Sequence, residues 1–74
     1  MSDITIKVLL TLLSKNKVTA STLATDFCVS KKTIYRCIDC LSISGVPVYT
    51  KQGKSGGIVL DESFDIRKFI LSKH

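Results

Sequence analysis

The chain has 74 residues, of which 45% are hydrophobic, and its formal net charge is +5 at pH 7. This length holds one domain, and the apolar content supports a packed core and excludes a disordered chain. The charge favours a polyanionic partner, nucleic acid first and an acidic membrane surface second, whereas no apolar stretch approaches the roughly 20 residues that a bilayer-spanning helix needs.

The first predicted element is a helix over residues 3–15, with Ser2 or Asp3 as its cap. Apolar residues recur along it at spacings of three, four and seven, which is typical of a helix with one buried face. They are Ile6, Leu9, Leu10 and Leu13. We expect this stripe to lie in the core, and Asn16 to end the helix in a left-handed turn.

A second, short helix is predicted over residues 20–27. Thr19 before it is a favourable N-cap, and Leu23 and Ala24 share its inner face with Phe27. The small side chain of Ala24 allows another helix to approach closely.

A third helix is predicted over about residues 30–44, with Ser30 as N-cap and Gly45 and Pro47 as its stop signals. Its inner stripe is Ile34, Ile38 and Leu41. The opposite face carries Lys32, Arg36 and Ile43, with Tyr35, Asp39 and Cys40 beside them. From Ser30 to Leu60 there are five basic residues and one acid, Asp39, so this segment nets five minus one, or +4.

Beyond Gly45 the apolar period changes to 2, which predicts an antiparallel hairpin over about residues 46–60 with a basic, glycine-rich tip. We expect Val18 to pair with this hairpin as a third strand. Residues 61–74 hold too many apolar side chains for a free tail. Asp61 or Ser63 is expected to cap a short C-terminal helix there, which serves as a linker or a dimerisation segment.

These elements predict an α+β fold, a winged helix-turn-helix: a three-helix core with a small hairpin, followed by a short helix. A short helix, a tight turn and a basic second helix form a unit whose second helix fits the major groove of double-stranded DNA. A basic hairpin directly after it is the wing. Residues 1–60 are thus expected to form one DNA-binding domain.

The ordered combination of motifs resembles the winged helix-turn-helix domains of DeoR-like regulators, especially those heading WYL-domain bacterial transcription regulators. The resemblance spans about residues 4–60. Its motifs are Val18-Thr19-Ala20, Leu23-Ala24, Val29-Ser30, Thr33-Ile34-Tyr35-Arg36, Ile38, Leu41, Gly45-Val46-Pro47-Val48-Tyr49 and Gly56-Gly57. It implies a transcription repressor whose effector-sensing domain lies beyond this chain. On general grounds we also expect a homodimer, because two copies on a palindromic site combine their contacts.

The resemblance and the side-chain chemistry together assign the DNA contacts. The residues expected to contact base edges in the major groove are Lys32, Thr33 and Arg36. Phosphate contacts are assigned to Thr19, Ser21, Ser30, Lys31, Tyr35, Lys51 and Lys54. The chain departs from the family at Cys28, where the turn often has glycine, and at Cys37, where aspartate usually follows the arginine.

Two alternatives stay open: a protein-interaction winged-helix adaptor without DNA binding, and the N-terminal DNA-binding domain of a biotin ligase-like protein.

Cys28, Cys37, Cys40 and His74 invite a zinc or redox interpretation, but two thiols on one helix are not a zinc knuckle. We expect Cys28 and Cys37 at the edge of the core, Cys40 on the surface, no disulfide, no metal and no cofactor. The acidic start lacks the basic character of a secretory leader, which favours a reducing cytoplasm. No catalytic set stands out, so we expect no enzyme.

Overall fold

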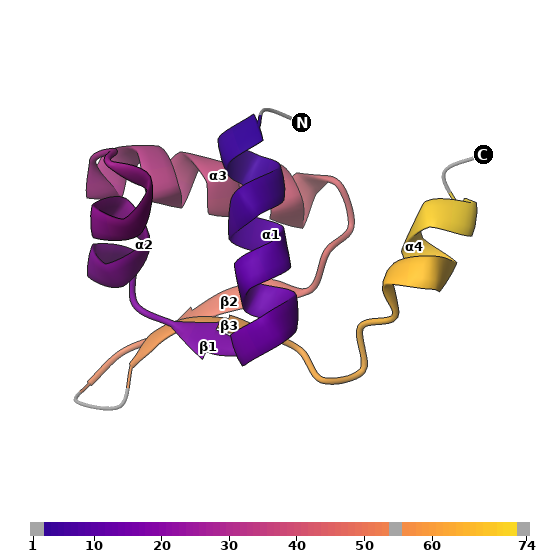
Figure 1. Ribbon diagram of the computed structural model, residues 1–74. Helices are drawn as coiled ribbons and strands as arrows, with labels where there is room; N and C mark the ends of the chain where they lie inside the picture. The colour runs from indigo at the N-terminus through magenta and orange to yellow at the C-terminus, as the bar shows by residue number, and fades with distance from the viewer. Residues whose placement is uncertain (1–2, 54–55, 73–74) are drawn as a thin grey trace.

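The computed structural model describes residues 3–53 and 56–72, which form four helices and one three-stranded sheet (Figure 1). In chain order these elements are α1 (Asp3–Lys15), β1 (Lys17–Val18), α2 (Ala20–Phe27), α3 (Lys31–Ile43), β2 (Val48–Lys51), β3 (Gly57–Leu60) and α4 (Ile66–Ser72). The fold is the predicted α+β winged helix-turn-helix.

Local capping chemistry sets where the helices of the core begin and end. The backbone N–H of Thr22 donates to the hydroxyl oxygen of Thr19 at 3.1 Å, so Thr19 is the N-cap of α2. Ser30 caps α3 in the same way. Asn16 ends α1 with φ 65°, and Gly45 follows α3 with φ 103°. All four roles were predicted.

The sheet has the strand order β1-β3-β2, and both pairs are antiparallel. Ile58 in β3 lies opposite Val18 on one side and Thr50 on the other. The short strand at Val18 therefore pairs with the hairpin as expected, and it ties the start of α2 to the wing.

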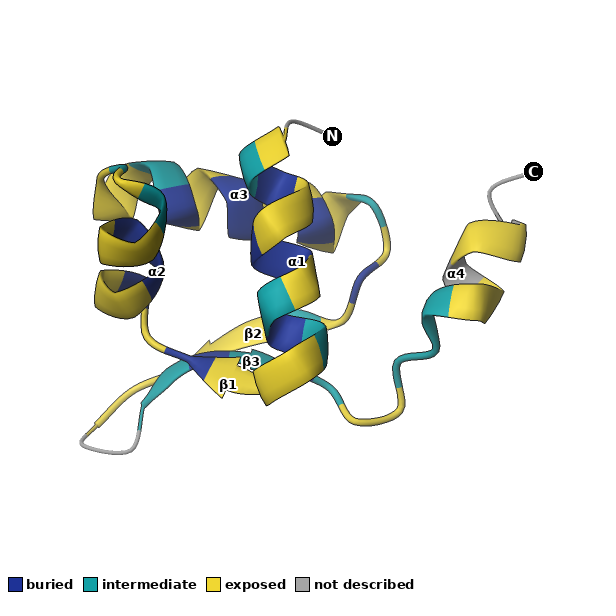
Figure 2. Cartoon of the chain, viewed as in Figure 1, coloured by how far each residue is buried: buried dark blue, intermediate teal, exposed yellow. Residues whose placement is uncertain are grey.

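The core lies between the three helices and the inner face of the sheet (Figure 2). Its largest fully buried side chains are Leu12, Leu23, Ile34, Leu41 and Ile58. Every helix of the core and the hairpin contribute to this list, so none of these elements buries its apolar face alone.

The predicted inner face of α1 is wrong in part: Leu9 is buried as expected, but the other three residues of the stripe are not. Ile6 and Leu10 are 43% and 58% exposed and Leu13 is half-buried, whereas the buried residues of this helix are Thr5, Val8, Leu9 and Leu12. Because α1 carries apolar residues on most of its circumference, two overlapping stripes satisfy the same helical spacing. Packing against α3 selects the stripe that contains Leu12.

The C-terminal helix exists, but its predicted caps are wrong. Asp61 accepts hydrogen bonds at 2.8 Å from the backbone N–H and the hydroxyl of Ser63, which closes a turn before any helix begins. The helix α4 starts later, where Asp65 accepts from the backbone N–H of Arg67 at 2.9 Å. Figure 1 shows α4 beside the main body, on the side away from the hairpin tip.

None of the described helices combines the length and hydropathy that crossing a membrane requires.

Candidate nucleic-acid interface

The helix α3 presents one face to the core and the opposite face to solvent. Its buried residues are Ile34, Cys37, Ile38 and Leu41. Its outermost residues, at spacings of four, three and four, are Lys32, Arg36, Asp39 and Ile43, and all are exposed. Ile43 is 86% exposed, so the far end of this stripe is apolar and open.

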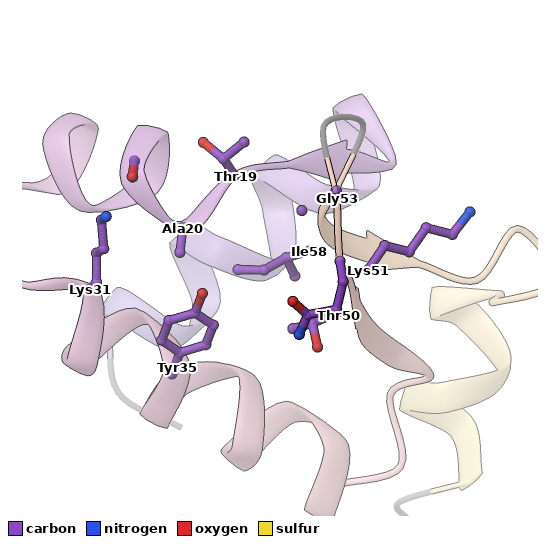
Figure 3. Close-up of a pocket in the computed structure, with 12 residues that line it drawn as sticks. Thr19, Ala20, Lys31, Tyr35, Thr50, Lys51, Gly53 and Ile58 are labelled. Carbon is purple, nitrogen blue, oxygen red and sulfur yellow. The ribbon is translucent and has the colours of Figure 1, made fainter.

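A hollow of about 440 Å³ lies between the start of α2, the start of α3 and the hairpin (Figure 3). Five of the seven predicted phosphate contacts line it: Thr19, Ser21, Lys31, Tyr35 and Lys51. These residues come from three separate elements, and the fold brings them to one concave surface beside the exposed stripe of α3. Of the other two, Ser30 is exposed at the N-cap of α3, and Lys54 lies outside the described residues.

The side chains around the hollow point in different directions. In Figure 3 the hydroxyl of Tyr35 points into the hollow, while the Lys51 side chain extends away from it. Lys51 also lines a second hollow, with Lys17 and Tyr49, on the other face of the sheet. Because side chains alternate along β2, Lys51 forms the wall of the first hollow while its charge lies on the outer face of the wing.

Both helices that border the hollow lack an acidic residue in their first turn. A common cap has glutamate at the third helical position, but Thr22 and Thr33 occupy that position here. The side-chain hydroxyl of Thr19 donates to that of Thr22 at 2.8 Å, and the hydroxyls of Ser30 and Thr33 lie 3.1 Å apart. The positive ends of both helix dipoles are thus left without a neighbouring carboxylate, which suits a phosphate.

The three predicted base contacts do not all lie on one stripe of α3. Lys32 and Arg36 are exposed on the outer stripe, and no ion pair or side-chain hydrogen bond joins either of them to another described side chain. Thr33 is half-buried and shares its hydroxyl with Ser30. It lies on a flank of α3, where it lines a further hollow together with Arg36, Cys37 and Cys40.

Sequence reasoning did not single out Thr50 and Gln52, which also line the main hollow. The signal was present, because Val48, Thr50 and Gln52 alternate along one side of the second strand. The wing also depends on glycine: a Cβ on Gly56 would overlap the carbonyl oxygen of Lys51.

The turn between α2 and α3 is left-handed at Cys28, with φ 57° and ψ 43°. Its backbone N–H donates to carbonyl oxygens of the last turn of α2. The expectation that Cys28 lies at the edge of the core is wrong, because the residue is exposed, whereas Cys37 is buried and Cys40 is exposed as expected. A residue with a Cβ in this conformation costs about 1–2 kcal/mol compared with glycine.

The thiols do not gather into a site. All three cysteines are free. Within residues 3–53 and 56–72, no group of three or more histidine, cysteine, aspartate or glutamate side chains is arranged to hold a metal ion. His74 lies outside these ranges.

Comparison with known proteins agrees with the helix-turn-helix fold. The profile of a family described as HTH domain matches residues 5–59. Over 57 residues the chain is 42% identical to an uncharacterized HTH-type transcriptional regulator, YobV, of Bacillus subtilis (strain 168). The aligned part covers 77% of this chain and 18% of that protein, so the chain spans less than a fifth of its relative's length. No solved structure gives a significant match.

Proposed function

Because the chain belongs to the HTH domain family, we propose that it is the part of a longer transcription repressor that recognises a specific DNA sequence. One observation carries the proposal: the hollow bordered by two helix starts, Lys31 and Tyr35 lies directly beside the stripe of α3 that exposes Lys32 and Arg36. A surface of this shape accepts a phosphate backbone while the adjoining helix enters the major groove.

In the proposed binding mode, Lys32 and Arg36 of α3 reach base edges. Arg36 donates two hydrogen bonds to a guanine, which is worth about 1–3 kcal/mol of discrimination. Thr33 contributes less than first expected, because its hydroxyl is already engaged with Ser30.

The backbone of one DNA strand occupies the hollow. There the N–H groups of the first turns of α2 and α3 point toward phosphate, with Ser21, Lys31 and Tyr35 around them. The wing follows the adjacent backbone or minor groove. Lys51 adds sequence-independent attraction from the outer face of the sheet, where its charge lies.

Fluorescence anisotropy with a mixed-sequence DNA duplex at several salt concentrations tests the proposal. We expect the chain to bind the duplex at low salt. The logarithm of the binding constant should fall linearly with the logarithm of the salt concentration, with a slope of about −0.9 for each neutralised phosphate. Lys31→Ala should weaken binding and reduce the slope by about 1, whereas the matched control Lys68→Ala, in α4 far from the hollow, should change neither. A chain that binds no duplex at low salt would instead be a protein-interaction adaptor.

We further propose that the longer protein is a cytoplasmic homodimer with an effector-sensing domain beyond this chain. The relative's greater length supports a further domain, and the free thiols suit a reducing compartment. A single module buries only about 600–1,000 Å² on DNA, and two copies on a palindrome combine their contacts. Sedimentation of the full-length regulator, with and without a palindromic duplex, tests the dimer.

A further inference from the structure

One carboxylate lies on the otherwise basic outer face of α3. Asp39 is the only acidic residue between Ser30 and Leu60, and it is exposed. It follows Lys32 by seven residues and Arg36 by three, so the three side chains occupy adjoining rows of one helix face.

No residue in the described part of the chain pairs with this carboxylate. The ion pair found there joins Arg67 and Asp65 in α4, at 3.6 Å, and no side-chain hydrogen bond reaches Asp39. Arg36 is close enough in sequence to pair with Asp39 along the helix, yet the two form no ion pair. Each is therefore free to meet a different group on a partner.

An unpaired carboxylate on a DNA-facing helix repels phosphates and weakens binding to DNA of any sequence. The first turns of α2 and α3, where phosphates are expected, hold no acid. Asp39 instead lies in the middle of α3, on the stripe that faces base edges in the proposed binding mode. At that position a carboxylate contributes favourably to DNA binding only if a base offers it a hydrogen-bond donor.

Resting on the proposed function, we infer that Asp39 is a specificity-determining residue that accepts a hydrogen bond from the N4 amino group of a cytosine. In the major groove cytosine presents this donor alone, whereas guanine and thymine present acceptors that a carboxylate rejects. Asp39 lies about 4.5 Å beyond Arg36 along the helix axis, by a rise of about 1.5 Å per residue. Because the two side chains occupy adjoining rows of one helix face, the cytosine is expected in the pair next to the guanine read by Arg36.

Selection of binding sites from a randomised duplex pool tests the inference, using the unmodified chain, Asp39→Ala, Asp39→Asn and the control Glu62→Gln. Glu62 is an exposed acid in the turn after β3, where it lines the outer hollow with Lys51, so its substitution removes the same charge away from the α3 stripe that faces base edges. The unmodified chain and the control should select a cytosine in the pair next to the guanine. Asp39→Ala should lose the preference at that pair alone, and Asp39→Asn should shift it toward adenine, which pairs with an amide through N6 and N7.

Anisotropy on the selected site and on a mixed-sequence duplex gives the second measurement. For Asp39→Ala the ratio of the two affinities should fall roughly 5- to 150-fold, while affinity for mixed DNA stays level or rises. Asp39 is exposed and has no ion pair or side-chain hydrogen bond to another described residue, so both variants should fold, which circular dichroism checks.

Three results would overturn the inference. If Asp39→Ala selects the same sites with the same ratio, Asp39 does not read DNA, although the proposed function stands. If the variant loses its preference at the guanine instead, Asp39 positions Arg36 and makes no cytosine contact. If the unmodified chain binds no duplex, the proposed function fails as well.

Discussion

The hydroxyl oxygen of Ser30 accepts a hydrogen bond from the backbone N–H of Thr33 at 3.2 Å, and the two side-chain oxygens lie 3.1 Å apart. Thr19 and Thr22 repeat this arrangement at the start of α2. Both helices are thus capped by neutral groups at the ends that border the hollow. Stabilising the helix and attracting phosphate are therefore separable at these positions.

Ser30→Asp separates the two roles. Aspartate caps a helix as well as serine and interacts favourably with the dipole, so the free energy of unfolding should stay level or rise by up to about 1 kcal/mol. Affinity for a DNA duplex should fall at least tenfold at low salt, because a carboxylate then lies where a phosphate is expected. Urea denaturation and anisotropy measure the two effects. Undiminished DNA affinity in a folded variant would remove the start of α3 from the interface.

Cys28→Gly should stabilise the domain by about 1 kcal/mol. Glycine adopts the left-handed conformation of the turn without the steric cost that a Cβ imposes. Cys28→Ala is the matched control, because it removes the thiol but keeps the Cβ, and it should bring no such gain. Thermal unfolding under reducing conditions compares the three chains, and equal stability of the glycine and alanine variants would contradict the strain argument.

Leu12→Ala and Leu10→Ala test which face of α1 is buried. Leu12 is fully buried, so its truncation should cost about 2–5 kcal/mol, enough to unfold much of a domain this small. Leu10 is 58% exposed, and its truncation should cost well under 1 kcal/mol. Denaturant titrations of both variants give the comparison. A reversal of the order would show that the helix packs in the other phase.

Arg36→Ala and Lys54→Ala should affect DNA binding differently. Arg36→Ala should weaken a selected site by about 1–3 kcal/mol more than it weakens random DNA, because the lost hydrogen bonds discriminate between bases. Lys54→Ala should weaken both alike, since a lysine on the wing contributes sequence-independent attraction. Anisotropy on both duplexes measures the ratio. An unchanged ratio for Arg36→Ala would mean that this residue does not read bases.

Asp61, at the start of the C-terminal segment, makes the free energy of unfolding depend on pH. Hydrogen bonds from the backbone N–H and then the hydroxyl of Ser63 hold the pKa of Asp61 below its ordinary value. A carboxyl group whose pKa is lowered on folding stabilises the folded state at pH values above its unfolded pKa of about 3.9. That stabilisation is lost as the pH falls through the pKa of the folded state. Asp61→Asn should therefore be less stable than the unmodified chain at pH 7, and the difference should shrink below about pH 4. A pH series of denaturation curves checks the trend.

Element types and most helix ends were predictable because they depend on neighbours within a few residues. The caps at Thr19 and Ser30, and the left-handed ends at Asn16 and Gly45, involve only groups of the adjoining turn. The change of apolar period after Gly45 likewise predicts the hairpin without knowledge of distant contacts. The boundary of α4 was missed because Asp61, Ser63 and Asp65 all have side chains that can cap a helix, and only the folded chain shows which of them precedes its first turn.

By itself, the sequence determined the winged helix-turn-helix order of elements and the outward direction of Lys32 and Arg36, because α3 has a single apolar stripe and thus one way to pack. Only the tertiary structure decided that Leu12 and not Leu10 enters the core, since α1 offers two stripes and its partners lie far away in the chain. The same holds for the hollow, whose walls come from three elements that meet only when β1 pairs with β3. Local chemistry acts over a few residues, whereas burial depends on what long-range packing leaves uncovered.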